Sequence, residues 1–202
     1  MGAATTRQQI VEAADRLFYE RGFEATSFAD IAAVVGLSRG NFYYHFKTKD
    51  EILDAVIAHR LSKTKAMLDA WEAVAEAPSE RIRRFIHMLI MNQRKIMAFG
   101  CPVGTLCSEL AKLDHAAKDG ATKLFTLFRV WLSHQFTALG HETDADELAM
   151  HILMRSQGVA ALATAFRDDA FVRREVEDMC QWLAAQHPTS ITQTKTASVQ
   201  NS

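Results

Sequence analysis

The sequence predicts an all-α protein, with a small N-terminal head of three helices, a larger C-terminal helical body and about nine helices in all. Two observations favour this fold class. The 202 residues include only 3 Pro and 9 Gly, the residues that interrupt helices most strongly. Apolar residues recur at helical spacing along most of the chain, and runs of β-branched residues are few.

The first expected helix covers residues 7–22. Its apolar positions recur at helical spacing with charged residues between them, and they are Ile10, Val11, Ala14, Leu17 and Phe18. Gly22 is a natural C-terminal stop, because glycine readily adopts the backbone conformation that ends a helix. One face of this helix should therefore pack against the rest of the head.

Two short helices joined by a tight turn are expected next. Ser27 and Asp30 have the residue types of an N-cap and an acidic first turn, and they predict a helix over 28–35. Ser38 repeats the N-cap signal before a helix over about 39–46. A turn of this length that contains a glycine permits the steep crossing of a helix-turn-helix.

The chain after residue 46 is expected to form longer helices. Phe42 and Phe46 lie four residues apart and should face inward together, and Thr48 with Glu51 has the pattern of a capping box. That box predicts a long helix over about 49–75. Breaks at Pro78, at Gly100 to Pro102 and at Gly140 separate the remaining expected helices, which cover 79–98, 103–113, 116–139, 144–167 and 169–186.

Residues 188–202 are polar and without periodicity, so they are expected to be a disordered tail. The predicted domains are therefore a helix-turn-helix domain over 1–50, a body over 51–187 and this tail.

Composition and charge limit the classes of protein. Hydrophobic residues make up 49% and charged residues 23%, as in ordinary globular proteins. The net charge of −1 lacks the basic excess usual in nucleic-acid-binding domains, so any such contact must depend on local charge placement. Three cysteines, no signal-peptide core and no apolar run long enough to span a membrane lead us to expect a cytoplasmic protein.

The second short helix carries residue types suited to reading DNA. In a helix-turn-helix this helix lies in the major groove, and its N-terminal residues reach base edges. Arg39 can pair in bidentate fashion with guanine and Asn41 with adenine, while Gly40 allows a close backbone approach. Between residues 39 and 49 there are four basic or titratable cationic side chains and no acid, so a local positive surface is possible.

Neighbouring side chains can bind the phosphate backbone. Tyr43, Tyr44 and His45 offer hydroxyl and ring N–H donors. Lys49 lies at the start of the long helix, where the free amides and the helix dipole also favour a phosphate. On the pattern alone, however, two capped helices and a glycine turn also occur in helical proteins that bind no DNA.

The stretches Thr26 to Ala32 and Val35 to Leu53 resemble the signature of the tetracycline-repressor (TetR/AcrR) family. The similarity covers about residues 7–55, with Phe42 where leucine is common. It implies an all-α homodimer with a DNA-binding head and a body that binds a small molecule, and it implies no particular ligand. The residues expected to line the DNA are Ser27, Ser38, Arg39, Gly40, Asn41, Tyr43, Tyr44, His45 and Lys49.

The body is expected to hold the effector pocket, which should be mostly apolar with a few polar groups. Aromatic residues, methionines and a few polar residues at helical spacing are the candidates. They are Phe85, Met88, Met91, Asn92, Cys101, Thr105, Phe125, Phe128 and Trp131. The alternative is that these aromatics and methionines form ordinary core.

The segment Gly100 to Cys107 suggests an alternative function. Cys101 precedes an expected helix, whose dipole favours a thiolate, so the protein could be a repressor that senses electrophiles or oxidants through this thiol. The other interpretation is that Cys101 and Cys107 pack as small apolar residues. Their spacing does not fit a zinc pair, and no metal or cofactor is expected.

A homodimer is expected to form through the last two helices. Residues 157–166 are rich in small side chains that let two helices approach closely. An apolar face continues on the final helix through Val172, Val176, Met179, Cys180 and Leu183. For each of these residues the alternative is a place in the core of its own protomer.

The expected function is a ligand-responsive transcriptional regulator. Two recognition helices of a dimer would enter successive major grooves of a near-palindromic operator, and an effector would release them. Repression follows from the family resemblance. An enzyme is disfavoured because no Ser-His-Asp set or HExxH motif occurs, and a helical interaction module without DNA binding is the remote alternative.

Overall fold

The computed structural model describes residues 5–74 and 77–186, apart from the Arg39 side chain. Across these ranges the fold is all-α, as predicted, and the tail expected over 188–202 lies outside them. The helices are α1 (Thr6–Arg21), α2 (Phe28–Val35), α3 (Arg39–His45), α4 (Lys49–Ala73), α5 (Pro78–Met91), α6 (Gln93–Phe99), α7 (Pro102–Lys112), α8 (Lys118–Ala138), α9 (Ala145–Phe166) and α10 (Asp169–Ala184).

One expected helix is divided in two. The helix predicted over 79–98 is interrupted at Asn92, where α5 ends and α6 begins. The Asn92 side-chain amide donates to the carbonyl of Met88 at 3.0 Å, and the Asn92 backbone N–H donates to the same oxygen. Asparagine competes in this way with helical hydrogen bonding, which accounts for the break and for the additional helix.

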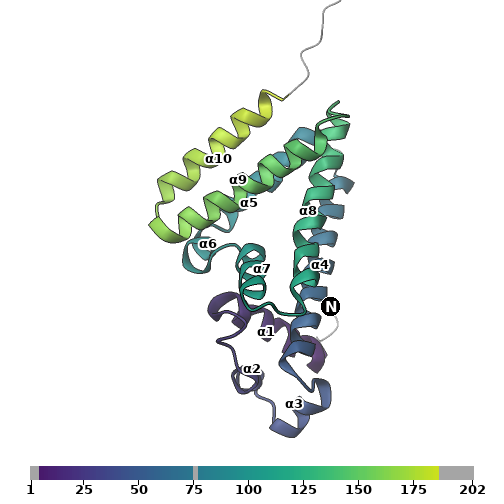
Figure 1. The fold of residues 1–202 in the computed structure, drawn as a ribbon, viewed down its shortest axis with the longest axis vertical. Helices are drawn as coiled ribbons and strands as arrows, with labels where there is room; N and C mark the ends of the chain where they lie inside the picture. Colours follow the sequence, from purple (N-terminus) through teal and green to yellow (C-terminus); the bar gives the residue numbers. More distant parts are fainter. Residues whose placement is uncertain (1–4, 75–76, 187–202) are drawn as a thin grey trace, which may run out of the picture.

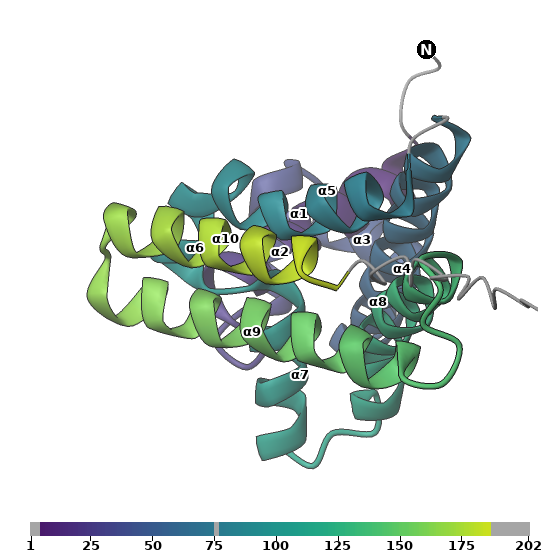
Figure 2. The ribbon, with the colours of Figure 1, turned by 90° about the horizontal axis from the view of Figure 1, so that it is seen from above.

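The helices form an elongated molecule with the head at one end (Figure 1). α1, α2 and α3 lie at the lower end of this view, and α4 and α8 run side by side away from them. α9 and α10 form an antiparallel pair toward the opposite end. Seen from above, α10 lies between α5 and α9, and it packs against both (Figure 2).

Two hydrophobic clusters lie under these helices. The first joins the head to the beginning of α4, through residues such as Ile10, Phe42 and Ile52, all fully buried. It also includes Leu106 and Leu110 of α7, so helices of the body complete the core of the head. The second cluster lies between α5, α8, α9 and α10, and the far half of α4 reaches it.

None of the described helices combines the length and the apolar character needed to cross a bilayer.

Candidate functional site

The turn between α2 and α3 follows the predicted capping pattern. Ser27 Oγ accepts from the Asp30 backbone N–H at 3.1 Å, and the Asp30 carboxylate accepts from the Ser27 backbone N–H at 2.8 Å. Two hydrogen bonds that Ser27 donates to the Asp30 carboxylate hold the pKa of Asp30 below its ordinary value. The bond from the Ser27 hydroxyl has the larger effect, and the bond from its backbone N–H has the smaller one. Gly36 ends α2 at φ 70°, where a side chain would be strained, so the chain can turn sharply into α3.

The inner face of α3 is apolar, as predicted. Phe42 and Phe46 are 0% and 1% exposed, and Ser38 Oγ caps the helix by accepting from the Asn41 N–H at 3.4 Å. The Phe28 ring meets the Phe42 ring edge-on at 4.5 Å between centroids. α3 is therefore held against the head by its aromatic side, and its orientation leaves the opposite side toward solvent.

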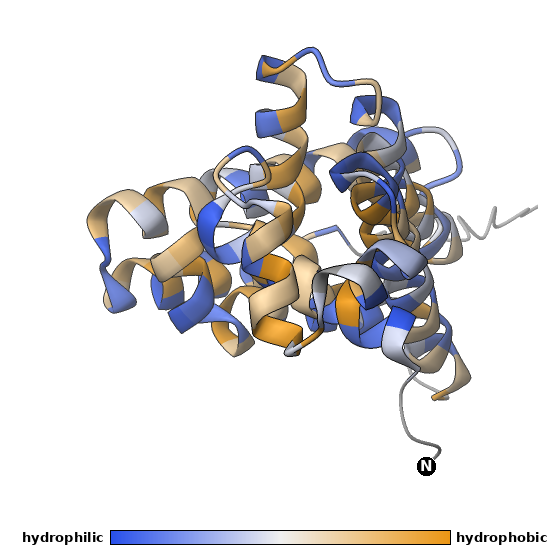
Figure 3. Ribbon diagram, turned by 90° about the horizontal axis from the view of Figure 1, so that it is seen from below, coloured by the Kyte–Doolittle hydropathy of each residue, from blue (hydrophilic) through white to orange (hydrophobic). Residues whose placement is uncertain are grey.

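The outer face of α3 carries most of the residues expected to line DNA. Gly40, Asn41, Tyr43 and Tyr44 are exposed, and Tyr44 is the most open of the aromatic residues at 79%. His45 is partly buried and meets the Tyr44 ring edge-on at 5.2 Å. Figure 3, seen from the head's side, shows hydrophilic segments beside hydrophobic ones at this end of the molecule.

Three further residues expected to line DNA lie at the starts of α2 and α3. Ser27 and Ser38 are exposed but serve as helix caps, and the backbone of Arg39 begins α3. The Arg39 side chain lies outside the part of the chain that the structure describes.

Lys49 has a local role that the sequence did not indicate. Its Nζ donates to the Phe23 carbonyl at 3.0 Å and to the Glu24 carbonyl at 3.5 Å, and it lies 4.2 Å from the centroid of the Phe23 ring. This ammonium group therefore fastens the α1–α2 loop to the start of α4. Next to it, Thr48 Oγ1 caps α4 by accepting from the Glu51 N–H at 3.1 Å.

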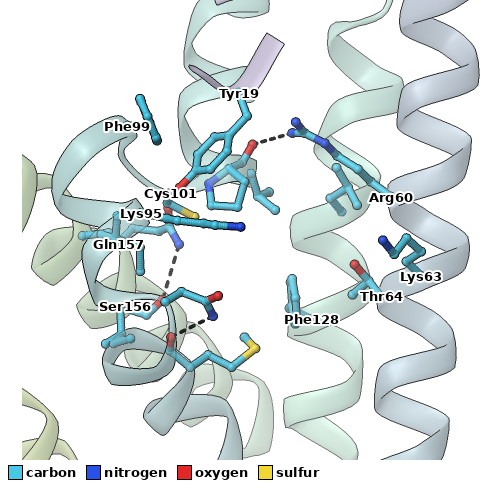
Figure 4. Close-up of a pocket in the computed structure, with 18 of the residues that line it drawn as sticks. Tyr19, Arg60, Lys63, Thr64, Lys95, Phe99, Cys101, Phe128, Ser156 and Gln157 are labelled. Atoms are coloured by element: carbon cyan, nitrogen blue, oxygen red, sulfur yellow. Dashed lines mark hydrogen bonds between the residues drawn. The ribbon is translucent and has the colours of Figure 1, made fainter. Parts of the chain in front are cut away.

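A cavity of about 580 Å³ lies where the head meets the body (Figure 4). Residues from α1 and from every helix between α4 and α9 line it. Of the residues predicted for a ligand site, six contribute to its wall: Phe85, Met88, Asn92, Cys101, Phe125 and Phe128.

Three predicted pocket residues lie elsewhere. Met91 is 79% exposed on the outer side of α5, because the cavity lies on the opposite side of that helix. Thr105 is exposed, and its hydroxyl donates to the Cys101 carbonyl at 2.8 Å. Trp131 is buried against Trp71, with the ring centroids 5.7 Å apart, and is part of the body's core.

Several lining residues were missed by sequence reasoning. Tyr19 comes from the head, Arg60 and Lys63 from α4, and Lys95 from α6. No local pattern could have identified them, because they become neighbours only when α1 folds against the body. The position of Tyr19 within α1 and that of Arg60 within α4 fit an ordinary contact between head and body as well as they fit a cavity wall.

Hydrogen bonds connect the wall of the cavity to the head. Arg60 Nε donates to the Asp15 carboxylate at 2.5 Å, and its Nη1 donates to the Pro102 carbonyl at 2.6 Å. The Tyr19 hydroxyl donates to the Gly100 carbonyl at 2.8 Å. Burial is the main cause that raises the pKa of Tyr19 to about 12, and the nearby Cys101 adds to it. This hydroxyl is therefore protonated and can donate at neutral pH.

α7 forms a second connection to the head, at the loop between α1 and α2. The Glu109 carboxylate accepts from the backbone N–H groups of Phe23 and Glu24, both at 2.9 Å. A Cβ at Gly22, where φ is 93°, would lie only 3.0 Å from Glu109 Oε1, so glycine allows this close approach. The α1–α2 loop is therefore held by a side chain of the body.

The two cysteines of this region differ. Cys101 directly precedes α7, as predicted, and the structure shows it to be the N-cap, with its Sγ accepting weakly from the Gly104 N–H at 3.5 Å. Cys107 packs against the head's core. Burial is the main cause that raises the pKa of Cys107 to about 11, and the neighbouring Cys101 also contributes. Among the described residues no group of three or more His, Cys, Asp or Glu side chains could hold a metal ion.

α9 and α10 present different faces to solvent. The five apolar α10 residues proposed for a dimer face are all buried against their own protomer: Val172, Val176, Met179, Cys180 and Leu183. For these residues the core alternative is correct. On α9, by contrast, Met150, Met154, Leu162 and Phe166 are 41%, 62%, 45% and 72% exposed at intervals of four or eight residues, with the exposed Gly158 between them.

Comparisons with known proteins agree with this architecture. The family model described as bacterial regulatory proteins, tetR family, matches residues 10–56. A second, described as the C-terminal domain of LmrA/YxaF-like transcriptional regulators, matches residues 78–178. A solved TetR transcriptional regulator from Legionella pneumophila covers 90% of this chain and 99% of its own, with a TM-score of 0.81 and 24% identity.

Individual curated relatives match different shares of the chain. An uncharacterized HTH-type regulator from the lacX 3' region of Lactococcus lactis is 30% identical over 137 residues, which are 66% of this chain and 69% of the relative. The regulator TtgR of Pseudomonas putida is 49% identical over 55 residues, 27% of this chain and 26% of that protein. From both family models and the Lactococcus relative, the chain belongs to the TetR family of bacterial helix-turn-helix transcriptional regulators.

Proposed function

We propose that this protein is a dimeric repressor that binds a near-palindromic operator through α3 and leaves it when a small molecule enters the cavity. The observation that carries the DNA-binding role is the two-sided character of α3, with Phe42 buried and Asn41 and Tyr44 exposed. Repression is supported by relatives such as the repressor DhaR of Mycobacterium, which is 26% identical over 133 residues.

The residues expected to line DNA divide into different roles in this proposal. Arg39 and Asn41 read bases in the major groove, and Gly40 lets the backbone come close. Ser27, Ser38, Tyr43, Tyr44 and His45 contact phosphates and fix the register of the complex. Lys49 supports the DNA surface mainly by fastening the α1–α2 loop, since its ammonium already donates to two carbonyl groups.

The exposed stripe on α9 is the proposed dimer surface. Four large apolar side chains on one helix face are costly to leave in water, and a second copy of the same helix would cover them. Met154→Glu should therefore yield a monomer in size-exclusion chromatography with light scattering. Met91→Glu, at an even more exposed methionine of α5, should leave the dimer intact, and equal behaviour of the two variants would contradict this surface.

The cavity is proposed as the effector site, with α7 carrying its signal alongside α4. An effector that separates α1 from the α6–α7 segment would strain the bonds that Arg60 and Tyr19 make to it. Because Glu109 of α7 holds the α1–α2 loop, the displacement would reach the head and change the spacing of the two recognition helices. The change in DNA affinity equals the difference in effector binding between the two states.

DNA binding can be tested by fluorescence anisotropy with DNA flanking the gene, at stated salt concentrations because affinity depends on salt. Arg39→Ala should lose the preference for operator over scrambled DNA. Tyr44→Phe, which removes one hydroxyl, should weaken binding to both DNAs alike. Arg173→Ala, at an exposed position on α10, is the control, and unchanged binding in both head variants would refute the proposed roles.

A thiol-sensing repressor is the second candidate, because Cys101 both lines the cavity and caps α7. In this version an electrophile alkylates Cys101 and the adduct acts as the effector. Mass spectrometry after mild alkylation should find Cys101 modified, with Cys107 as an internal control that burial protects. An unmodified Cys101 with unchanged DNA affinity rules this version out and leaves the reversible effector.

A further inference from the structure

We infer that the cavity selects amphipathic anions: molecules with an apolar, ring-sized body and one carboxylate or sulfonate end. The inference rests on the proposed effector site and adds the chemical class of its ligand. Two features carry it. A pair of lysines faces the space from opposite walls, and the remaining polar groups of the wall are largely occupied by one another.

The lysines are Lys63 of α4 and Lys95 of α6. Both line the cavity, and Figure 4 shows their ammonium ends directed toward the space between the two walls. Within the described part of the chain neither ammonium has a carboxylate or hydrogen-bond partner. An anion placed between them would gain two favourable charge interactions that no protein group now supplies.

The acidic residues of the wall all come from α1 and are partly engaged. Asp15 is bonded to Arg60 at 2.5 Å, and the Glu12 carboxylate accepts from the Gln8 side-chain amide at 3.1 Å. Glu20 lies on the same helix, where Arg16 adds a positive charge to the wall. The carboxylates are therefore confined to the α1 side, and the lysines on α4 and α6 set the charge preference of the remaining rim.

The inner wall suits the apolar part of such a ligand. Phe85 and Phe128 meet edge-on at 5.4 Å, and the space around them is lined mainly by aliphatic and aromatic side chains. Each of the three polar side chains there already donates one hydrogen bond to a protein oxygen. The Asn92 amide donates to Met88 at 3.0 Å, the Gln157 amide to Ser156 at 3.4 Å, and the Ser156 hydroxyl to Leu153 at 2.7 Å.

This arrangement orients the ligand. A charge placed at the inner end would be surrounded mainly by apolar carbon, which is unfavourable for an anion. The acid group therefore lies at the lysine end, and the apolar body extends toward Phe85 and Phe128. Neutral apolar compounds would fill the same space without the charge interactions, and cations would be disfavoured.

Two fluorescent dyes test the inference in the full-length protein. 8-Anilinonaphthalene-1-sulfonate carries a sulfonate, and N-phenyl-1-naphthylamine has the same ring system without it. The variant Lys63→Met/Lys95→Met should weaken the sulfonate dye by roughly five- to tenfold, the range expected for two solvent-accessible charges. The neutral dye should bind within about twofold of the parent protein, because methionine keeps the apolar stem.

The matched control is Lys65→Met/Lys123→Met, which removes the same charge from exposed lysines outside the cavity. Competitive displacement of the neutral dye by the sulfonate dye shows that both use one site. A selective loss in the cavity variant supports the inference, whereas equal losses in the two double variants, or no loss, overturn it. If neither dye binds, the inference fails together with the proposed effector site.

Discussion

The head and the body place their candidate functional residues in different ways. In the head, one short helix carries Asn41 and Tyr44 on its outer side and Phe42 on its inner side, so surface and core are separate sets. In the body, residues such as Phe85 and Phe128 belong to the core and also line the cavity. The exposed side of α3 can therefore be altered with little effect on stability, whereas changes in the cavity also affect packing.

The two regions are nevertheless one mechanical unit. Leu106 and Leu110 of α7 lie in the same hydrophobic cluster as Phe42 of α3. The first half of α4 also belongs to this cluster, and Leu68 of the second half belongs to the body's cluster. A displacement of α7 would therefore act on the core of the head as well as on its loops.

The largest effect is expected from Phe42→Ala. Compared with a substitution on the exposed side of α3, this variant tests whether the helix has a distinct buried side. Removing this fully buried ring should lower the free energy of unfolding by about 3–5 kcal/mol, measured by urea denaturation. Tyr44→Ala, two residues away on the exposed side, should change it by less than about 0.5 kcal/mol. Similar costs for the two variants would mean that α3 has no distinct inner face.

Arg60→Met tests the connection between head and body. It leaves the Asp15 carboxylate and the Pro102 carbonyl without their partner, and we expect a loss of about 2–3 kcal/mol in unfolding free energy. Lys65→Met breaks an exposed ion pair with Asp69 on the same helix and should cost less than about 0.5 kcal/mol. Should both variants unfold at the same urea concentration, the Arg60 bonds are not a stabilising link.

Thr48→Ala examines the start of the helix that the two regions share. Loss of the bond from the Glu51 N–H should reduce stability by about 1 kcal/mol, the usual contribution of an N-cap. Thr122→Ala is the control, because that hydroxyl only donates to a carbonyl within α8. Calorimetry should show a lower melting temperature for Thr48→Ala and almost none of this change for Thr122→Ala.

The smallest effect concerns the pH dependence of the α2 cap. Because the pKa of Asp30 is lowered in the folded protein, its contribution is fully present above the ordinary value of 3.8 and is lost as pH falls through the lowered value. An NMR titration should find the Asp30 carboxyl titrating below 3.8, and Ser27→Ala should raise that midpoint. An unchanged midpoint would show that the Ser27 hydroxyl does not stabilise the carboxylate, since the backbone N–H of residue 27 remains in the variant.

Much of the head could be predicted because its signals are local. Ser27 and Ser38 cap the helices that their positions indicated, and Phe42 and Phe46 face inward at a spacing that a single helix determines. The use of Lys49 could not be predicted in the same way. Its partners are carbonyl groups about 25 residues earlier in the chain, and they meet it only after α1 has packed against α4.

The body was less predictable for the same reason. Met91 and Met88 are close in the same amphipathic helix, yet Met91 points to solvent and Met88 lines the cavity. On α10 the apolar residues could have faced a second subunit or their own core, and burial of Met179 shows that the latter holds. Periodicity identifies an apolar face but not the partner that covers it.

By itself, the sequence determined the helical class, the family, the caps of α2 and α3, and the inward face of α3, because these depend on residues a few positions apart. The tertiary structure alone decided that Tyr19, Lys63 and Lys95 share one cavity with the body's phenylalanines, and that Glu109 holds the head's loop. Those groups come from helices far apart in the chain, and only the packing of the two hydrophobic clusters brings them together.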